Sequence, residues 1–268
     1  MAQTAVKPIK KGSFTSLSII VIIINLIIGI LFYKYVAGNK ANFKEDGQPL
    51  EGNYLGIIYK GGFIVPILLA LFLTVWVFFF ERLMTLIKAK GNGSIEAFLQ
   101  KVKYHLTNHD IDAALKECDR QKGSVANVVN AGLHKYAEMR NNNEFTTEQK
   151  VLNIGKEIEE ATSLEMPALE KHLPILATIA SIGTLIALLG TVLGMIRAFA
   201  ALATEGTPNP TALSAGISEA LVNTAIGIGT SALAIIFYNI FTGMIDKLTY
   251  AIDEIGFTIT QTFAATEK

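Results

Sequence analysis

Four long apolar runs divide this sequence, and polar stretches separate them. The runs lie at 14–32, at 61–83 and in the two halves of 173–247. A helix needs about 20 apolar residues to cross the ~30 Å hydrocarbon layer of a membrane, and the runs are of this length or longer. We therefore predict an all-α, polytopic membrane protein with four transmembrane helices.

The same pattern divides the chain into five segments. They are an N-terminal anchor with a periplasmic loop (1–60), a second transmembrane helix (61–90), a cytoplasmic helical region (91–172), a transmembrane hairpin (173–247) and a cytoplasmic helical tail (248–268).

The two arms of the hairpin are unusually rich in Gly, Ala, Ser and Thr. In a membrane, small residues mark faces on which helices approach closely, and hydroxyls mark contacts with protein or water. Thr184 and Thr191 share one face of the first arm. The positions that we expect to pack the two arms together are Gly190, Gly194, Gly216, Asn223 and Gly227.

Residues at equal distance from the hairpin tip should lie at equal depth, because both arms rise by about 1.5 Å per residue. With the tip at Pro208, Thr191 is level with Thr224 near the middle of the layer, and Arg197 is level with Glu219. A charge inside a membrane is costly unless it is paired or faces water. We therefore expect an ion pair between Arg197 and Glu219, within one hairpin or between neighbouring copies.

Two motifs in the hairpin resemble a known family. The first is GTVLGM at 190–195, followed by Phe199; the second is GISEAL at 216–221, followed by TAIG at 224–227 and YN at 238–239. They resemble the MotA/TolQ/ExbB proton-channel family over roughly 61–248, most nearly ExbB and then TolQ. The resemblance implies a stator subunit of a bacterial inner membrane, in which a homo-oligomeric ring, five in ExbB, surrounds two copies of a single-helix partner like ExbD or TolR.

The resemblance also implies an indirect mechanism. The protonated carboxylate belongs to the partner's helix, protons are the transported ion, and no cofactor is involved. Thr191 and Thr224 would supply hydroxyls or hold water along the pore, with Thr184 on the same face. Glu219 would either act on the proton route or serve mainly as the partner of Arg197. The work then passes to a TonB-like transducer.

Charged residues next to the apolar runs indicate the orientation. Arg82, Lys88 and Lys90 directly follow the second run, and basic ends of membrane helices usually lie in the cytoplasm. Both termini are then cytoplasmic, and the loop 202–212, which has no Lys or Arg, lies outside. The first run is an addition to the three-helix pattern of ExbB and TolQ. We interpret it as a retained anchor rather than a cleaved signal, because it is longer than the usual apolar core of a signal.

The polar segment 91–172 shows helical spacing, with Ser94 and Asp110 as expected N-caps. Thr146 and Gln149 form a capping box that opens a further helix. We expect this helix to continue, with kinks at Pro167 and Pro174, over about 85 Å from 147 to 203, so that it extends from the cytoplasm into the membrane. The C-terminal 244–268 should extend the fourth span in the same way.

The composition narrows the range of possible functions. The chain is 51% hydrophobic with no net charge, which favours a membrane protein and gives no indication of nucleic-acid binding. The single cysteine, Cys118, excludes an intrachain disulfide, and we expect a buried, reduced thiol. His105 and His109 lie four residues apart near acidic residues, but no HExxH pattern supports a metal site. No phosphate loop or nucleophile elbow is present either, so we do not expect an enzyme.

Three functions remain open from the sequence. The preferred one is an ExbB-like stator that energises TonB-dependent transport across an outer membrane. The second is a TolQ-like unit for envelope maintenance, or a stator for surface motility. The third is a structural scaffold that conducts no protons, which predicts that valine is tolerated at Thr191 and Thr224.

Overall fold

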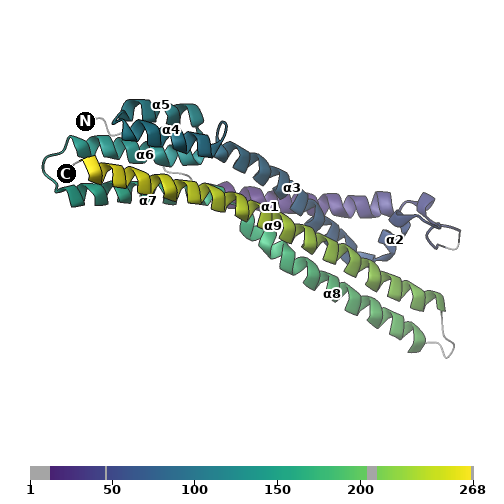
Figure 1. Cartoon of the computed structure of the whole chain (residues 1–268). Helices are drawn as coiled ribbons and strands as arrows, with labels where there is room; N and C mark the ends of the chain where they lie inside the picture. The colour runs from purple at the N-terminus through teal and green to yellow at the C-terminus, as the bar shows by residue number, and fades with distance from the viewer. Residues whose placement is uncertain (1–12, 46, 204–209, 267–268) are drawn as a thin grey trace. The chain divides into compact units, whose positions relative to one another are not determined.

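The computed structural model describes residues 13–45, 47–203 and 210–266. Within these residues the chain forms helices and connecting loops, with no β-strand (Figure 1). The α-helices are α1 (Ser13–Leu31), α2 (Tyr54–Lys60), α3 (Val65–Lys90), α4 (Ile95–Thr107), α5 (Ile111–Gln121), α6 (Gly123–Arg140), α7 (Thr147–Leu169), α8 (Leu173–Ala203) and α9 (Pro210–Thr266). The expected hairpin tip at Pro208 and the basic stretch 1–12 lie outside the described residues.

Four helical stretches are long and apolar enough to cross a membrane. They are Ser18–Ala37, Gly62–Thr107, Leu173–Leu202 and Pro210–Thr266. The prediction of an all-α protein with four membrane helices is therefore confirmed.

The chain packs as two compact units. The first unit contains Met1–Phe79 and Ile175–Phe237, and the second contains Phe80–Pro174 and Tyr238–Lys268. Both α3 and α9 contribute residues to each unit, so the division cuts through continuous helices rather than following loops.

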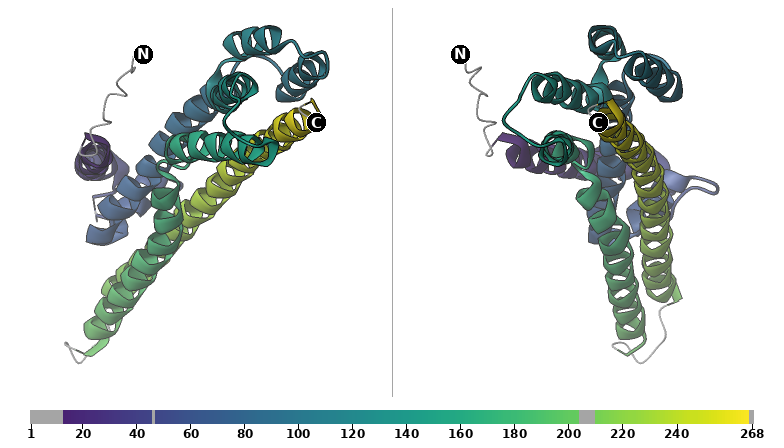
Figure 2. Two further views of the ribbon diagram at one scale, coloured as in Figure 1. Left: turned by 90° about the vertical axis from the view of Figure 1, so that its left-hand side faces the viewer. Right: turned by 60° about the vertical axis from the view of Figure 1, so that its left-hand side comes forward.

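In the first unit, α8 lies antiparallel beside the first half of α9, as all three views show (Figures 1 and 2). The N-terminal helix α1 contacts α3, where the Asn25 side-chain amide donates a 3.0 Å hydrogen bond to the Thr74 hydroxyl, and both residues are buried. At the other end of this unit's part of α3, the Phe79 ring lies 4.2 Å from the ring of Phe237 in α9.

The segment between α1 and α3 is more ordered than its polar sequence indicates. Asn42 donates through its side-chain amide to the carbonyls of Val36 (2.7 Å) and Ala37 (3.0 Å). Asn53 donates to the Asn42 side chain at 3.0 Å and also caps the start of α2. Asparagine side chains that bond nearby backbone groups stabilise such turns in place of regular structure, and this function is hard to read from polarity alone.

In the second unit, α6 and α7 lie side by side with the end of α9 (Figure 1). The ring of Tyr136 in α6 meets the ring of Phe263 in α9 edge-on at 4.8 Å. The helix starts are as predicted: the side chains of Ser94 and Asp110 cap α4 and α5, and Thr146 opens α7 with a capping box.

The prediction of one continuous helix over 147–203 is wrong. The helix stops at Leu169, and α8 begins at Leu173. His172 has a φ of 67°, a left-handed conformation that no helix interior accepts. Pro174, at the second position of α8, has no amide hydrogen to donate to a preceding turn, and a helix start requires none there. Pro167, by contrast, lies inside α7.

Candidate functional site in the membrane hairpin

Small residues allow α8 and α9 to approach closely. Gly190, Gly194, Gly216, Asn223 and Gly227 are all buried in the first unit. A Cβ atom on Gly194 would lie 2.8 Å from the carbonyl oxygen of Gly216, and one on Gly190 would lie 2.7 Å from Asn223 Cγ. The structure thus brings the expected packing positions of the two arms into direct contact, and a side chain in place of either glycine would push the helices apart.

Two hydroxyls meet across this interface. Thr191 Oγ1 in α8 is hydrogen-bonded to Thr224 Oγ1 in α9. Each hydroxyl also reaches the carbonyl four residues before it, that of Ala187 at 3.1 Å and that of Ala220 at 3.0 Å. The structure therefore brings together the two threonines that the depth argument places at one level.

The threonine pair offers more acceptors than donors. A hydroxyl has one hydrogen to donate and two lone pairs that accept, so only one of the two threonines can donate to the other at a time. Its partner then donates to its own backbone carbonyl, and the direction can reverse without moving a heavy atom. The hydrogen bond between the two hydroxyls can therefore point from Thr191 to Thr224 or from Thr224 to Thr191.

The Arg197–Glu219 pair lies nearer than the threonine pair to the end of α8 and the beginning of α9. Arg197 Nη1 is 2.6 Å from Glu219 Oε1 and 2.7 Å from Oε2. The Glu219 side chain is only 8% exposed, whereas that of Arg197 is 52% exposed. The two charges are thus paired within one hairpin, and Glu219 is enclosed while Arg197 keeps one open side.

Asn223 links α9 to the beginning of the second span. It is fully buried, and its side-chain amide donates a 2.9 Å hydrogen bond to the carbonyl of Gly61. Among the described residues its Oδ1 atom has no hydrogen-bond partner, and neither does Ser231 Oγ two turns further along α9. Sequence reasoning placed Asn223 on the packing face but did not identify its contact with Gly61.

Thr184 stands apart from these contacts. It is exposed on α8, two turns before Thr191, and the structure does not bring it into contact with the hydroxyl pair.

Sequence reasoning missed a second charged cluster, which lies in the second unit. Arg82 donates to both carboxylate oxygens of Glu81 at 2.7 Å and to the carbonyls of Ala168 (3.1 Å) and Leu169 (3.3 Å). His172 Nδ1 lies 2.8 Å from Glu81 Oε2. The guanidinium satisfies the last carbonyls of α7 at the break before α8. The signal in the sequence is the charged pair Glu81–Arg82 directly after an apolar run.

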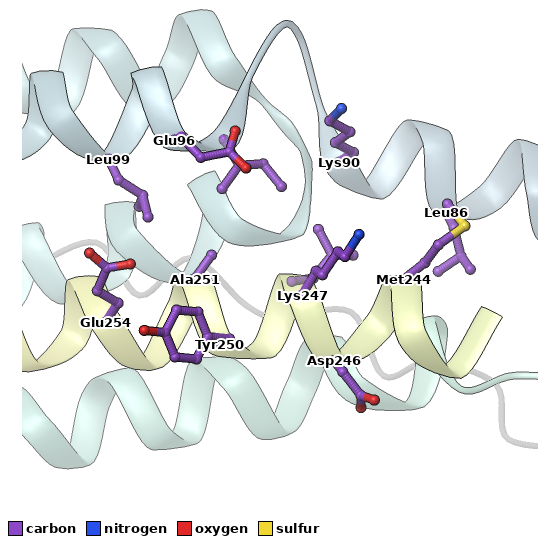
Figure 3. A pocket seen from close by; sticks show the side chains of 12 residues that line it. Leu86, Lys90, Glu96, Leu99, Met244, Asp246, Lys247, Tyr250, Ala251 and Glu254 are labelled. Atoms are coloured by element: carbon purple, nitrogen blue, oxygen red, sulfur yellow. The ribbon is translucent and has the colours of Figure 1, made fainter. Parts of the chain in front are cut away.

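A groove of about 660 Å³ opens in the second unit between the ends of α3 and α9 and the beginning of α4 (Figure 3). Apolar side chains such as Leu86 and Leu99 line it, with Lys90, Glu96 and Lys247 among them. Across the part of the chain that the structure describes, no three His, Cys, Asp or Glu side chains gather as a metal site. Burial raises the pKa of the Cys118 thiol to about 12, as expected for an inert core cysteine.

Comparison with known proteins agrees with the site's geometry. The sequence model of the MotA/TolQ/ExbB proton channel family matches residues 120–254. This is half of the chain, and it includes the threonine pair, the Arg197–Glu219 pair and Asn223. The chain belongs to the MotA/TolQ/ExbB proton channel family. Helices α1 to α4 lie outside the matched residues.

Named relatives include both TolQ and ExbB. The chain is 30% identical to the Tol-Pal system protein TolQ of Pseudomonas aeruginosa over 188 residues, which cover 68% of this chain and 78% of that protein. It is 36% identical to the biopolymer transport protein ExbB of Salmonella typhimurium over 81 residues, 30% of this chain and 33% of that protein. A putative ExbB-like transport protein of Synechocystis is 35% identical over 89 residues, 32% of this chain and 42% of that protein. The chain is therefore a stator-type proton channel subunit by family, and both branches are among its relatives.

Proposed function

We propose that this chain is the proton-channel stator subunit of an inner-membrane motor that converts the proton gradient into mechanical work. It acts as a homo-oligomer, a pentamer, around two copies of a single-helix partner like ExbD or TolR. The motor drives a TonB-like transducer and so energises transport across an outer membrane. Both termini lie in the cytoplasm, and the loop between α8 and α9 faces the periplasm.

The hydrogen bond between Thr191 and Thr224 is the observation that supports this proposal most directly. Two hydroxyls that meet inside a membrane hairpin, with backbone carbonyls as alternative acceptors, form a polar step in an otherwise apolar interface. Protons that pass this step reach a carboxylate on the partner's helix. When that carboxylate is protonated, a costly charge is removed from the membrane and the partner helix prefers a different position in the ring.

The electrical part of the gradient supplies about 2.3 kcal/mol per charge for each 100 mV. Repeated protonation and release then turn one component against the other. Glu219 pairs with Arg197 at the periplasmic end, and the release of this pair controls access to the threonine pair.

The experiment is proton flux into liposomes that contain this chain and its single-helix partner, with Thr191→Val and Thr224→Val. Valine keeps the shape but removes the hydroxyl, and size measurement checks that the oligomer persists. The matched control is Thr230→Val, because Thr230 lies in α9 beyond Thr224 and is buried, and the hydrogen bond of its hydroxyl goes to the carbonyl of Ile226 (2.8 Å) rather than to another hydroxyl.

We expect the two pair variants to lose at least tenfold in flux and Thr230→Val to stay within twofold of the wild type. If all three variants conduct like the wild type, the hairpin only packs, and the non-conducting scaffold is the better description.

A TolQ-like function in envelope maintenance is the second candidate. It is favoured by the length of the match to TolQ of Pseudomonas aeruginosa, which covers 78% of that protein. Deletion of the gene separates the two functions. Loss of growth on large chelated nutrients indicates the ExbB-like function, and leakage of periplasmic proteins with detergent sensitivity indicates the TolQ-like one.

A further inference from the structure

The turn Gly61–Phe63, which we call the GGF turn, joins the N-terminal segment to α3 and meets the ion pair of the hairpin. Gly62 has a φ of 76°, and a Cβ atom built on it would lie 2.8 Å from Glu219 Cδ and nearer still to a carboxylate oxygen. The backbone can therefore approach the carboxylate this closely only because residue 62 is glycine.

The same turn contacts the other partner of the ion pair. The Phe63 ring centroid lies 5.5 Å from Arg197 Cζ, a distance typical of a cation–π contact. One helical turn beyond Glu219, Asn223 holds the carbonyl of Gly61 at 2.9 Å. Three consecutive residues of the turn thus touch Asn223, Glu219 and Arg197 in that order.

The N-terminal segment holds the GGF turn in place. The Tyr33 hydroxyl donates a 2.9 Å hydrogen bond to the carbonyl of Tyr59, and the two rings stack at 4.7 Å. Tyr59 lies in α2, which ends at the residue before Gly61. Helix α1, the following π-helical turn and α2 all lie outside the residues that match the family model.

These contacts restrict the ion pair. A carboxylate and a guanidinium on long side chains normally lose contact by rotating about their side-chain bonds, at little cost where water is near. Here the carboxylate has the GGF turn on one side and α9 behind it, and it is only 8% exposed. Glu219 cannot swing away from Arg197 unless the turn also moves.

We propose that the GGF turn is a positioning clamp for the Arg197–Glu219 pair, through which the N-terminal segment sets how readily Glu219 leaves Arg197. Gly62, Phe63 and Asn223 are its positioning residues. Only the last step, from the release of Glu219 to proton access, rests on the proposed function.

The first test is the reaction of Glu219 with the membrane-soluble reagent dicyclohexylcarbodiimide, read by mass spectrometry of the peptide that contains Glu219. The variant is Gly62→Ala in the full-length chain. The matched control is Gly52→Ala, because Gly52 has nearly the same φ (77°) but nothing within 4 Å of its Cβ position. Both variants carry the same backbone strain, and only Gly62→Ala displaces the carboxylate.

We expect Gly62→Ala to raise the labelling of Glu219 at least threefold and Gly52→Ala to change it by less than 1.5-fold. Equal labelling in the two variants would overturn the clamp. Phe63→Leu, which strains no backbone and keeps an apolar side chain, should raise labelling at least twofold, and this variant decides the question if Gly62→Ala does not assemble.

A size-compensation test adds a readout that general destabilisation would not move. Glu219→Asp shortens the carboxylate side chain and leaves room for the methyl group of Gly62→Ala. The double variant should therefore lose less thermal stability than the sum of the two single losses, as contacting residues do. Strict additivity would contradict direct contact.

The labelling experiment tests the clamp and the flux experiment tests the proposed function, so either one can fail without the other. If Thr191→Val leaves the flux unchanged while Gly62→Ala raises the labelling, the proposed function is wrong and the clamp stands. If Thr191→Val stops the flux and Gly62→Ala leaves the labelling unchanged, the clamp is wrong and the function stands.

Discussion

Two arginine–glutamate pairs of this chain, Arg82–Glu81 and Arg197–Glu219, differ in what holds them. Arg82 in the second unit is 1% exposed, and its guanidinium bonds to Glu81 and to the fixed carbonyls of Ala168 and Leu169. Arg197 in the first unit is half-exposed, and its guanidinium bonds to the Glu219 carboxylate and, within the described residues, to no backbone carbonyl. The Arg82 guanidinium thus bonds to backbone carbonyls as well as to a glutamate side chain, whereas the Arg197 guanidinium bonds to a glutamate side chain.

This difference determines which pair can open. Removing a buried guanidinium from two helix-end carbonyls leaves those carbonyls without partners, which is costly in a dry interior. Separating Arg197 from Glu219 exposes only side chains, one of which already has an open side. We infer that the Arg82 cluster fixes the break between α7 and α8, while the Arg197 pair is restrained by its neighbours and can respond to them.

The largest expected effect is on the buried arginine. Arg82→Met keeps the long apolar stem but leaves the carbonyls of Ala168 and Leu169 without this donor and Glu81 without its arginine. We expect a loss of about 3 kcal/mol in stability, the usual cost of breaking a buried pair. Thermal unfolding in detergent measures it. Arg197→Met is the comparison variant: it leaves the enclosed Glu219 carboxylate without its arginine but leaves no backbone carbonyl unpaired, so its loss should be smaller than that of Arg82→Met. Equal losses in the two variants would remove the distinction between the pairs.

A charge swap sharpens the comparison, with a smaller expected effect. Arg197→Glu and Glu219→Arg should each weaken assembly, and the double swap should restore about 1 kcal/mol or more, since each charge bonds chiefly to the other. The corresponding swap of Glu81 and Arg82 should restore nothing, because a glutamate cannot donate to the carbonyls of α7. If the double swap at 81–82 restored assembly, or if the one at 197–219 did not, our distinction between the two pairs would be reversed.

The smallest expected effect is on the reactivity of Cys118, which reports on the second unit alone. Burial raises its pKa to about 12, so at pH 8 almost no thiolate is present, and reaction with a thiol reagent should be slow and should accelerate as the pH rises toward 12. Arg82→Met should increase the labelling rate at pH 8 several-fold by opening this unit, while Arg197→Met should not. An increase with both variants would mean that the two clusters stabilise one cooperative structure.

Much of the fold was readable from local pattern. The apolar runs predicted the four spans because the membrane requires a minimum length of apolar helix. Ser94, Asp110 and Thr146 predicted helix starts because a cap acts on amides within three residues of itself. The depth argument brought Thr191 to Thr224 and Arg197 to Glu219 because a short hairpin loop leaves two antiparallel helices little freedom of register.

The features that were predicted wrongly or missed depend on contacts between residues distant in sequence. The helix predicted over 147–203 breaks where His172 takes a left-handed conformation. The last carbonyls of α7 are bonded by Arg82, which lies about ninety positions earlier in the sequence. The contact of Asn223 with Gly61 spans 162 positions and leaves no periodic trace in the sequence. The stretch after α1 is predicted only as a periplasmic loop, whereas the structure forms the short helix α2 there and Asn42 bonds the carbonyls of Val36 and Ala37.

The sequence by itself therefore determined the class of protein, the four spans, the packing faces of the hairpin and the register of its two polar pairs. Each of these follows from short-range rules: helix rise, apolar length and the size of residues one turn apart. Only the tertiary structure decided where the long helix breaks, which arginine is buried against backbone and that the GGF turn encloses Glu219. Those features arise where segments far apart in the chain meet, and their geometry depends on contacts that no local pattern encodes.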